Sequence, residues 1–204
     1  MSRVRSVLPL LLLVACGPGA AVGEAGIDVS GLWPATEGAF LAYRNRTPEQ
    51  LADPEQADVL DEANLLLSRY EAGGCGDTRV ALRVGGSWDS AIAVGALHLD
   101  TSGGVAICGH EGDDGTVEAY DPAVPLWVEG SPLEDAVPAT HEGWSVTASR
   151  EADLSTYFGV FPATVAFALS GDGALDGWVL HLADGFGLVL LETDTLAADL
   201  VYTR

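Results

Sequence analysis

The chain has 204 residues, with 9 basic and 30 acidic side chains, and its formal net charge at pH 7 is −21. A field of this sign and size repels phosphate backbones and anionic lipid headgroups. We therefore expect no nucleic-acid partner and no close contact of the protein body with an acidic membrane. Adaptation to salt and a GC-rich genome both favour such acidity.

The first 15 residues, MSRVRSVLPLLLLVA, have the layout of a bacterial signal peptide. Arg3 and Arg5 precede an apolar run from Val7 to Val14, which is far shorter than the ~20 residues that cross a bilayer as a helix. We expect residues 1–15 to direct export and then to be removed. The alternative is an ordinary secretory signal that ends near a chance Cys.

Cys16 completes the sequence Leu-Val-Ala-Cys, which matches the lipobox of bacterial lipoproteins. In that motif the Cys thiol takes a diacylglyceryl group, and two or three acyl chains, such as palmitate, hold a protein at a membrane effectively permanently. Cys16 is therefore the predicted lipid-attachment site, and the membrane is its predicted partner. Gly17 is not the Asp that retains lipoproteins at the inner membrane of enteric bacteria, which favours the outer membrane in a host that has one.

Removal of the signal peptide leaves 204 − 15 = 189 residues, a length that suits one domain. Residues 16–31 are small and Gly-rich without periodicity, as in a flexible tether between the lipid and the folded part. Residues 32–204 are the predicted single β-rich domain.

The stretch from Glu55 to Ala72 is the one substantial helix that the sequence predicts. Asp53 and Pro54 form a suitable N-terminus, and Gly73-Gly74 forms a stop. Apolar residues recur at helical spacing, at Leu60, Ala63, Leu67 and Tyr70.

From Arg79 onward the pattern predicts strands separated by Gly and Asp. The expected fold class is mainly β (α+β): a curved or partly closed antiparallel sheet with the helix packed on it or at its edge. The predicted strands are Arg79–Val84, Ser90–Leu99, Val105–His110, Thr116–Tyr120, Trp144–Arg150, Val160–Leu169, Trp178–Leu182, Phe186–Glu192 and Leu196–Tyr202.

Cys75 and Cys108 remain once Cys16 is lipidated. An even pair in an exported chain favours a disulfide, because export removes the chain from the reducing cytosol. The alternatives are two separate buried thiols, or a metal pair, for which the sequence has no CxxC motif.

Several segments together resemble a known group of proteins. WPATEGAFLAYR and VPATHEGWSV share a Pro, a Gly and a following aromatic residue, and we expect the Gly to turn the chain and the aromatic side chain to seat the next strand. With VFPATVAFAL and the terminal WVLHLADGFGLVLLE, they are similar to a broad group of uncharacterised bacterial lipoproteins. These have an aromatic-Pro/Gly/Trp-Tyr opening and a Gly-x-Gly-Leu-Val terminal hairpin.

The resemblance implies a β-rich single domain akin to the half-barrel of lipoprotein carriers, and it implies no activity. The sequence departs from the group in three respects. The predicted helix before Gly73 and the cysteines are not part of the group's pattern. Phe40 and Tyr43 stand where a Trp and Tyr pair is usual, and Asp184 stands where the hairpin has Pro.

Catalytic motifs are missing from the sequence. Gly85-Gly86-Ser87-Trp88-Asp89 lacks the last Gly of a nucleophile elbow, and neither His110-Glu111 nor His141-Glu142 continues into HExxH. Pairing of the 90s hairpin across a two-residue turn predicts His98 and His110 on opposite faces of the sheet. We expect no catalytic residue and no cofactor.

Two acidic loops are the better candidates for a metal, because carboxylate oxygens are the ligands that Ca²⁺ prefers. Neither loop has EF-hand spacing, and carboxylates in turns are the expected background in so acidic a chain, so we expect no metal site. The candidate ligands are Glu111, Asp113 and Asp114 in one loop and Asp172 and Asp176 in the other.

These features favour a non-enzymatic, membrane-anchored envelope lipoprotein with a structural or protein-interaction role. A carrier of a hydrophobic ligand such as a lipid, held inside a curved sheet, is the alternative. An uncharacterised enzyme is the third possibility. The sequence leaves the oligomeric state open.

Overall fold

The computed structural model describes residues 38–46, 65–73, 75–76, 78–84, 92–128, 133, 138–194 and 197–203. Within these ranges the regular structure is entirely β-strand, and no helix is present. The predicted signal peptide at 1–15 and the tether at 16–31 lie outside the described residues. No helix in the described ranges is long and apolar enough to cross a membrane.

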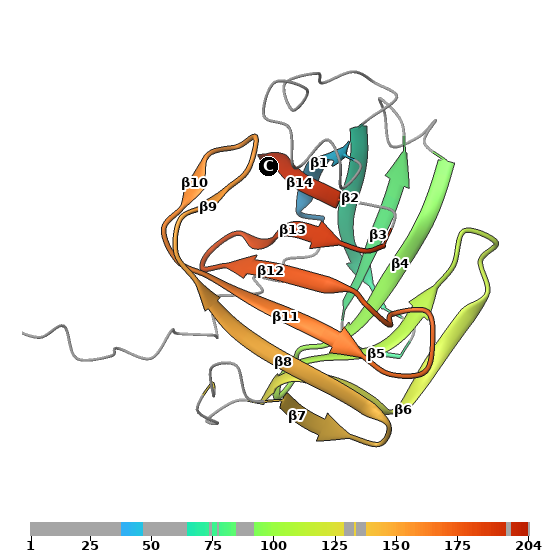
Figure 1. Cartoon of the computed structure of the whole chain (residues 1–204). Coiled ribbons are helices and arrows are strands. Elements are labelled where there is room, and N and C mark those ends of the chain that lie inside the picture. Colours follow the sequence, from blue (N-terminus) through green and yellow to red (C-terminus); the bar gives the residue numbers. More distant parts are fainter. Residues whose placement is uncertain are drawn as a thin grey trace, which may run out of the picture.

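Twelve strands form one sheet in the order β6-β5-β4-β3-β2-β1-β14-β13-β12-β11-β8-β7, and β10 and β9 form a separate hairpin (Figure 1). The bounds are β1 Phe40–Arg46, β2 Leu65–Ala72, β3 Thr78–Val84, β4 Ile92–Asp100, β5 Gly104–Glu111, β6 Val117–Val128, β7 Pro138–His141, β8 Trp144–Glu151, β9 Leu154–Ser155, β10 Val160–Phe161, β11 Thr164–Ser170, β12 Val179–Ala183, β13 Gly187–Glu192 and β14 Ala197–Thr203.

The sheet consists of two antiparallel meanders that meet at the first and last strands. Strands β1 to β6 are neighbours in chain order, and so are β7, β8 and β11 to β14. The pairing of β1 with β14 joins the two halves, with Arg44 opposite Asp199 and Tyr43 opposite Leu200. The continuity of the sheet therefore depends on residues more than 150 positions apart in the sequence.

The helix predicted over residues 55–72 is wrong at its C-terminal end. Residues 55–64 lie outside the described ranges, but Leu65–Ala72 is strand β2, which pairs with β1 on one side and β3 on the other. Leu66 and Leu67 point to opposite faces and both are buried. A strand covered on both faces does not alternate between apolar and polar residues, so its pattern was compatible with a helix.

One face of the sheet, here called the inner face, carries a continuous apolar core. The sheet curls so that β6 contacts β8, and the ring of Tyr120 lies 5.5 Å from that of Trp144 across this approach. Tyr43 of β1 is fully buried in the core and donates a hydrogen bond to the carbonyl of Leu188 in β13 at 2.8 Å. The largest buried side chains of this core also include Tyr70, Phe167, Leu66, Leu97, Leu99, Ile107, Leu175, Leu180, Leu182, Leu188 and Leu191.

The two similar segments noted in the sequence share a turn conformation. Gly38 has φ +82° and Gly143 has φ +91°, values that are strained for any residue with a Cβ. Gly143 turns β7 into β8, and the following Trp144 is buried in the core. The Gly and the aromatic residue of this second segment thus do what the sequence predicts.

Ser68 distinguishes strand β2 from the helix that the sequence predicted. Its side chain is 0% exposed in the strand, whereas on the helix it would lie opposite the Leu67–Tyr70 face. We predict that Ser68→Arg lowers the free energy of unfolding by about 3 kcal/mol or more, because it buries an unpaired charge.

Ala72→Arg is the matched control, since Ala72 is exposed on the same strand; it should change stability by less than about 0.5 kcal/mol. Urea unfolding followed by tryptophan fluorescence measures both variants. Equal stabilities would contradict the buried strand.

Candidate interaction surface and its supporting charge network

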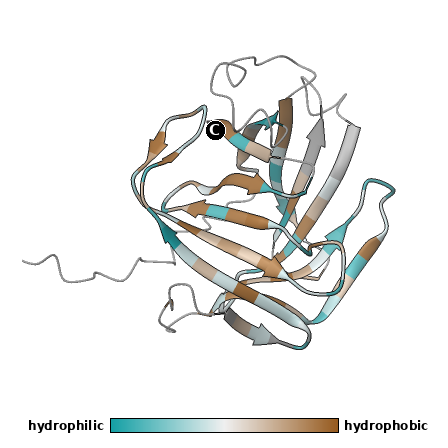
Figure 2. Cartoon of the chain, viewed as in Figure 1, coloured by the Kyte–Doolittle hydropathy of each residue, from teal (hydrophilic) through white to brown (hydrophobic). Residues whose placement is uncertain are grey.

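The β9–β10 hairpin leaves the sheet between β8 and β11 and projects from one edge of the molecule (Figure 1). At its tip Tyr157, Phe158 and Val160 are 46%, 43% and 63% exposed, respectively. Residues 154–164, LSTYFGVFPAT, contain no charged side chain, in a chain whose net charge is −21. The hydropathy colours of the hairpin strands in Figure 2 show the same apolar character. An exposed apolar group of this kind makes the hairpin tip the candidate interaction surface of the described residues.

Hydrogen bonds hold the tip of this hairpin against the body. The Tyr157 amide donates to Asp199 Oδ2 at 2.8 Å, and the Phe158 amide donates to the Leu200 carbonyl at 2.9 Å. The Thr156 amide and hydroxyl both donate to the Gly159 carbonyl, at 2.9 Å and 3.2 Å. The Tyr157 and Phe158 amides and the Gly159 carbonyl therefore find partners within the protein.

Aromatic packing fixes the base of the tip. The ring of Phe158 lies 6.0 Å from that of Phe161 and 5.6 Å from that of Phe186, and the last two rings are 5.1 Å apart. Phe161 is buried, whereas Phe158 keeps part of its ring exposed. The surface is thus formed by side chains in fixed positions.

The fully buried carboxylate of Asp199 supports the hairpin by accepting a hydrogen bond from its backbone. Arg44 donates to both of its oxygens, at 3.2 Å and 3.0 Å, and Arg46 Nη2 lies 3.0 Å from Oδ2. The guanidinium carbon of Arg44 also lies 4.9 Å from the centre of the Tyr157 ring. Because a charge is stable in the interior only when it is paired, Asp199 ties together β1, β14 and the hairpin.

A second cluster centres on His181 of β12. Its Nδ1 lies 2.7 Å from Glu151 Oε2 and its Nε2 lies 2.8 Å from Glu192 Oε2. Burial by itself would lower the pKa of His181, but the hydrogen bonds to Glu192 and Glu151 outweigh burial and raise it. The hydrogen bond from His181 lowers the pKa of Glu192. The cluster therefore favours an imidazolium between two carboxylates.

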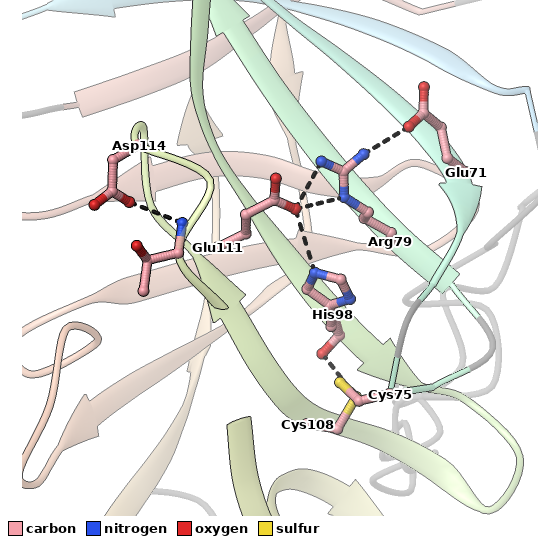
Figure 3. Close-up of polar contacts among 8 residues, drawn as sticks. Glu71, Cys75, Arg79, His98, Cys108, Glu111 and Asp114 are labelled. Carbon is pink, nitrogen blue, oxygen red and sulfur yellow. Dashed lines mark hydrogen bonds and ion pairs between the residues drawn. A yellow bond between two sulfur atoms is a disulfide. The ribbon is translucent and has the colours of Figure 1, made fainter. Parts of the chain in front are cut away.

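A third cluster crosses β2, β3, β4 and β5, and Figure 3 shows it. Arg79 Nη1 donates to Glu71 at 2.7 Å, while its Nε and Nη2 donate to Glu111 Oε2 at 3.0 Å and 2.7 Å. His98 Nε2 lies 3.5 Å from the same oxygen. Burial would raise the pKa of Glu111, but the Arg79 guanidinium outweighs burial and lowers it.

The disulfide between Cys75 and Cys108 lies beside this cluster (Figure 3). The two Cα atoms are 5.9 Å apart, and Cys108 Sγ lies 3.4 Å from the His98 carbonyl oxygen. A Cβ on Gly109 would come within 3.2 Å of Cys75 Sγ and 3.1 Å of the Glu118 carbonyl oxygen. The absence of a side chain at Gly109 thus makes room for the disulfide.

The acidic loops do not assemble a metal site: in the described part of the chain, no group of three or more His, Cys, Asp or Glu side chains could hold a metal ion. Glu111 is engaged by Arg79. Asp114 accepts a hydrogen bond from the Thr116 amide at 2.8 Å, and Asp176 accepts one from the Gly171 amide at 3.0 Å. Asp113 and Asp172 are exposed.

The described histidines lie in separate surroundings. Leu99 pairs with Ile107 and Leu97 with His110, so the predicted register is wrong by one residue near the turn and by two residues beyond a bulge at Cys108. His98 and His110 nevertheless lie on opposite faces. The ring of His110 lies 5.4 Å from that of Trp178, and burial lowers its pKa.

Sequence reasoning missed the apolar hairpin. Residues 160–169 were predicted as one strand, but the chain bends at Pro162 and Ala163 and divides into β10 and β11. The signals that could have revealed it are Pro162 and the absence of charged residues from 154 to 171 in an acidic chain. The Asp199 cluster had no local signal, because its partner Arg44 is 155 residues away.

No protein-family profile matches this chain, and no curated protein sequence matches it significantly. Among solved structures, the chain is similar to a candidate lipoprotein from Parabacteroides distasonis, with 9% sequence identity and a TM-score of 0.31. The similarity covers 85% of this chain and 98% of that chain. The likeness is distant, and the description of that protein specifies no ligand, partner or activity.

The disulfide should contribute measurably to stability. The cysteines are 33 positions apart, and closing a loop of that length contributes about 3–4 kcal/mol on the chain-entropy estimate. We predict that Cys75→Ser combined with Cys108→Ser lowers the unfolding free energy by about that amount, measured by urea unfolding. Dithiothreitol should destabilise the unaltered chain and leave the double variant unchanged. Free thiols at both positions in a non-reducing peptide map would refute the pairing.

The His181 cluster predicts a pH window of stability. Because the folded pKa of His181 is raised above 6.5, its contribution is lost as pH rises through the folded value. Because the pKa of Glu192 is lowered below 4.5, its contribution is lost as pH falls through that lowered value.

The cluster should therefore stabilise the fold most between pH 4.5 and pH 6.5, which are the ordinary pKa values of Glu and His. Urea unfolding at about pH 5.5 and about pH 8.5 should show a loss of stability at the higher pH, and His181→Gln should diminish that loss. An equal pH dependence in the variant would contradict this account.

Proposed function

We propose that this protein is a lipid-anchored, exported envelope protein that acts by binding and not by catalysis, and that its contact surface is the β9–β10 hairpin. The observation that carries this proposal is the exposed, uncharged tip formed by Tyr157, Phe158 and Val160. In a chain with 30 acidic residues, an apolar group held in place by hydrogen bonds needs a partner to be covered.

The charged clusters support a binding role over a catalytic one. Asp199, His181 and Arg79 each have their charge paired with side chains of neighbouring strands. An acid–base catalyst instead needs a group within reach of a bound substrate. The ion pairs described here have the arrangement that holds strands together, so an enzyme is the least favoured of the candidates.

The core favours a binding surface over a carrier of hydrophobic ligands. Large side chains such as Tyr43 and Phe167 occupy the inner face and are almost fully buried. A lipid carrier needs an interior volume of roughly 300–1,000 Å³ for its ligand. Native mass spectrometry of the protein from its host is the decisive comparison: a stoichiometric lipid would favour the carrier.

The place of action follows from the first 16 residues. The signal-like segment and the lipobox support export and lipidation at Cys16, and Gly17 supports the outer membrane in a host that has one. The tether of residues 16–31 then leaves the domain free to turn toward its partner.

The anchor has a direct test. We predict that Cys16→Ala moves the protein from the detergent phase to the aqueous phase in Triton X-114 partitioning, because the acyl chains are lost. Gly17→Ala is the matched control and should stay in the detergent phase. Retention of Cys16→Ala in carbonate-washed membranes would refute the lipid anchor.

A further inference from the structure

We propose that the partner of the β9–β10 hairpin is a zwitterionic lipid surface, into whose interface Tyr157, Phe158 and Val160 insert. This inference rests on the proposed function, because the anchor at Cys16 is what keeps the hairpin near a bilayer. It adds a second, non-covalent contact between the protein and the membrane.

The backbone of the tip is the first argument for lipid. A segment that enters the apolar part of an interface must satisfy its amide groups internally, since lipid offers no hydrogen bonds. The Tyr157 and Phe158 amides donate to Asp199 and Leu200, and the Gly159 carbonyl accepts from Thr156. A protein partner that adds a strand would need such groups to be available, and here they are already engaged.

The side chains of the tip are the second argument. Tyr157 and Phe158 are aromatic residues of the kind that gather at the boundary between headgroups and acyl chains. Val160 is the most exposed of the large apolar residues in the described ranges. The nearest charged residue on the preceding chain is Asp153, outside the uncharged run of residues 154–164.

The net charge determines which lipid fits. A body with a charge of −21 is repelled by anionic headgroups, so the hairpin can approach a neutral or zwitterionic surface at a lower electrostatic cost. An apolar tip of three exposed side chains binds a bilayer weakly by itself. The anchor makes that weak contact effective by raising the local concentration.

The length of chain before the domain permits this contact. Gly38 lies 38 − 16 = 22 positions after Cys16, a separation that spans at most about 75 Å when fully extended. The hairpin can therefore reach the bilayer that holds the anchor. Strand β6 lies on the side of the molecule away from the hairpin in Figure 1 and provides a comparison surface.

The test compares two labelled positions in the lipidated full chain reconstituted in phosphatidylcholine vesicles. Val160→Cys places the label on the hairpin, and Val117→Cys is the matched control, an exposed valine on β6. Each variant offers one reactive thiol for an environment-sensitive fluorophore, because Cys16 is acylated and Cys75 is bonded to Cys108.

We expect the emission of the label at position 160 to shift to shorter wavelength on reconstitution. A quencher carried on lipid acyl chains should quench it several-fold more strongly than the label at position 117. Vesicles with about one third anionic lipid should weaken that quenching at low salt. In the Val160→Cys background, Tyr157→Ser should reduce it further.

Equal access of iodide to both labels on floating vesicles would overturn the lipid contact and leave the anchor intact. If neither variant floats with the vesicles, both the anchor and the contact that depends on it are refuted. Shielding of position 160 that appears only after envelope proteins are added would also overturn the proposal, in favour of a protein partner.

Discussion

The carboxylate of Asp199 is the interaction on which the rest of the structure depends. It lies where the first and last strands of the sheet meet, is 0% exposed, and is paired with Arg44 and Arg46 of β1. Removal of this carboxylate would leave two buried guanidinium groups without their counter-ion, the kind of change that costs several kcal/mol. The same oxygen accepts the amide of Tyr157, so the joint between the two meanders also supports the exposed hairpin.

Charge continues from this joint across the outer face of the sheet. Arg46 lies near enough to Glu192 to lower its pKa, although the hydrogen bond from His181 is the larger cause. His181 then reaches Glu151 of β8. In the other meander, Arg79 pairs with Glu71 and Glu111 in the same manner, beside the disulfide. Each half of the sheet thus has an apolar inner face and a cross-strand row of paired charges on its outer face.

The pairing of charges between strands explains why the hairpin differs from the rest of the molecule in carrying no charge. The described Arg and His side chains of these clusters are engaged with carboxylates between strands, while residues 154–164 carry no charge at all. The acidic surface repels anionic membranes and polyanions, and hydrogen bonds hold the apolar tip against β14 of the sheet. With a lipid anchor at Cys16 and this hairpin in the bilayer interface, the protein would have two contacts of different strength with the membrane: the covalent lipid and the apolar side chains.

The sequence by itself determined the features whose cause is local. The apolar run before Cys16, the positions of Gly-turned strands such as β8, and the antiparallel character of the sheet follow from composition, alternation and turn residues. The opposite orientations of His98 and His110 agree with the sequence expectation only because a one-residue shift near the turn and a bulge at Cys108 displace the register by two residues in total. Either change alone would have placed both side chains on one face.

Only the tertiary structure decided which segments are covered on both faces and which distant charges meet. Leu65–Ala72 is a strand because β1 and β3 pair with it, and no periodicity within the segment contains that information. Arg44 and Asp199 are 155 residues apart, so neither predicts the other. The apolar hairpin depends on this pair as well. The Tyr157 amide donates to the Asp199 carboxylate, and that carboxylate is held in place by Arg44 only when β1 and β14 pair.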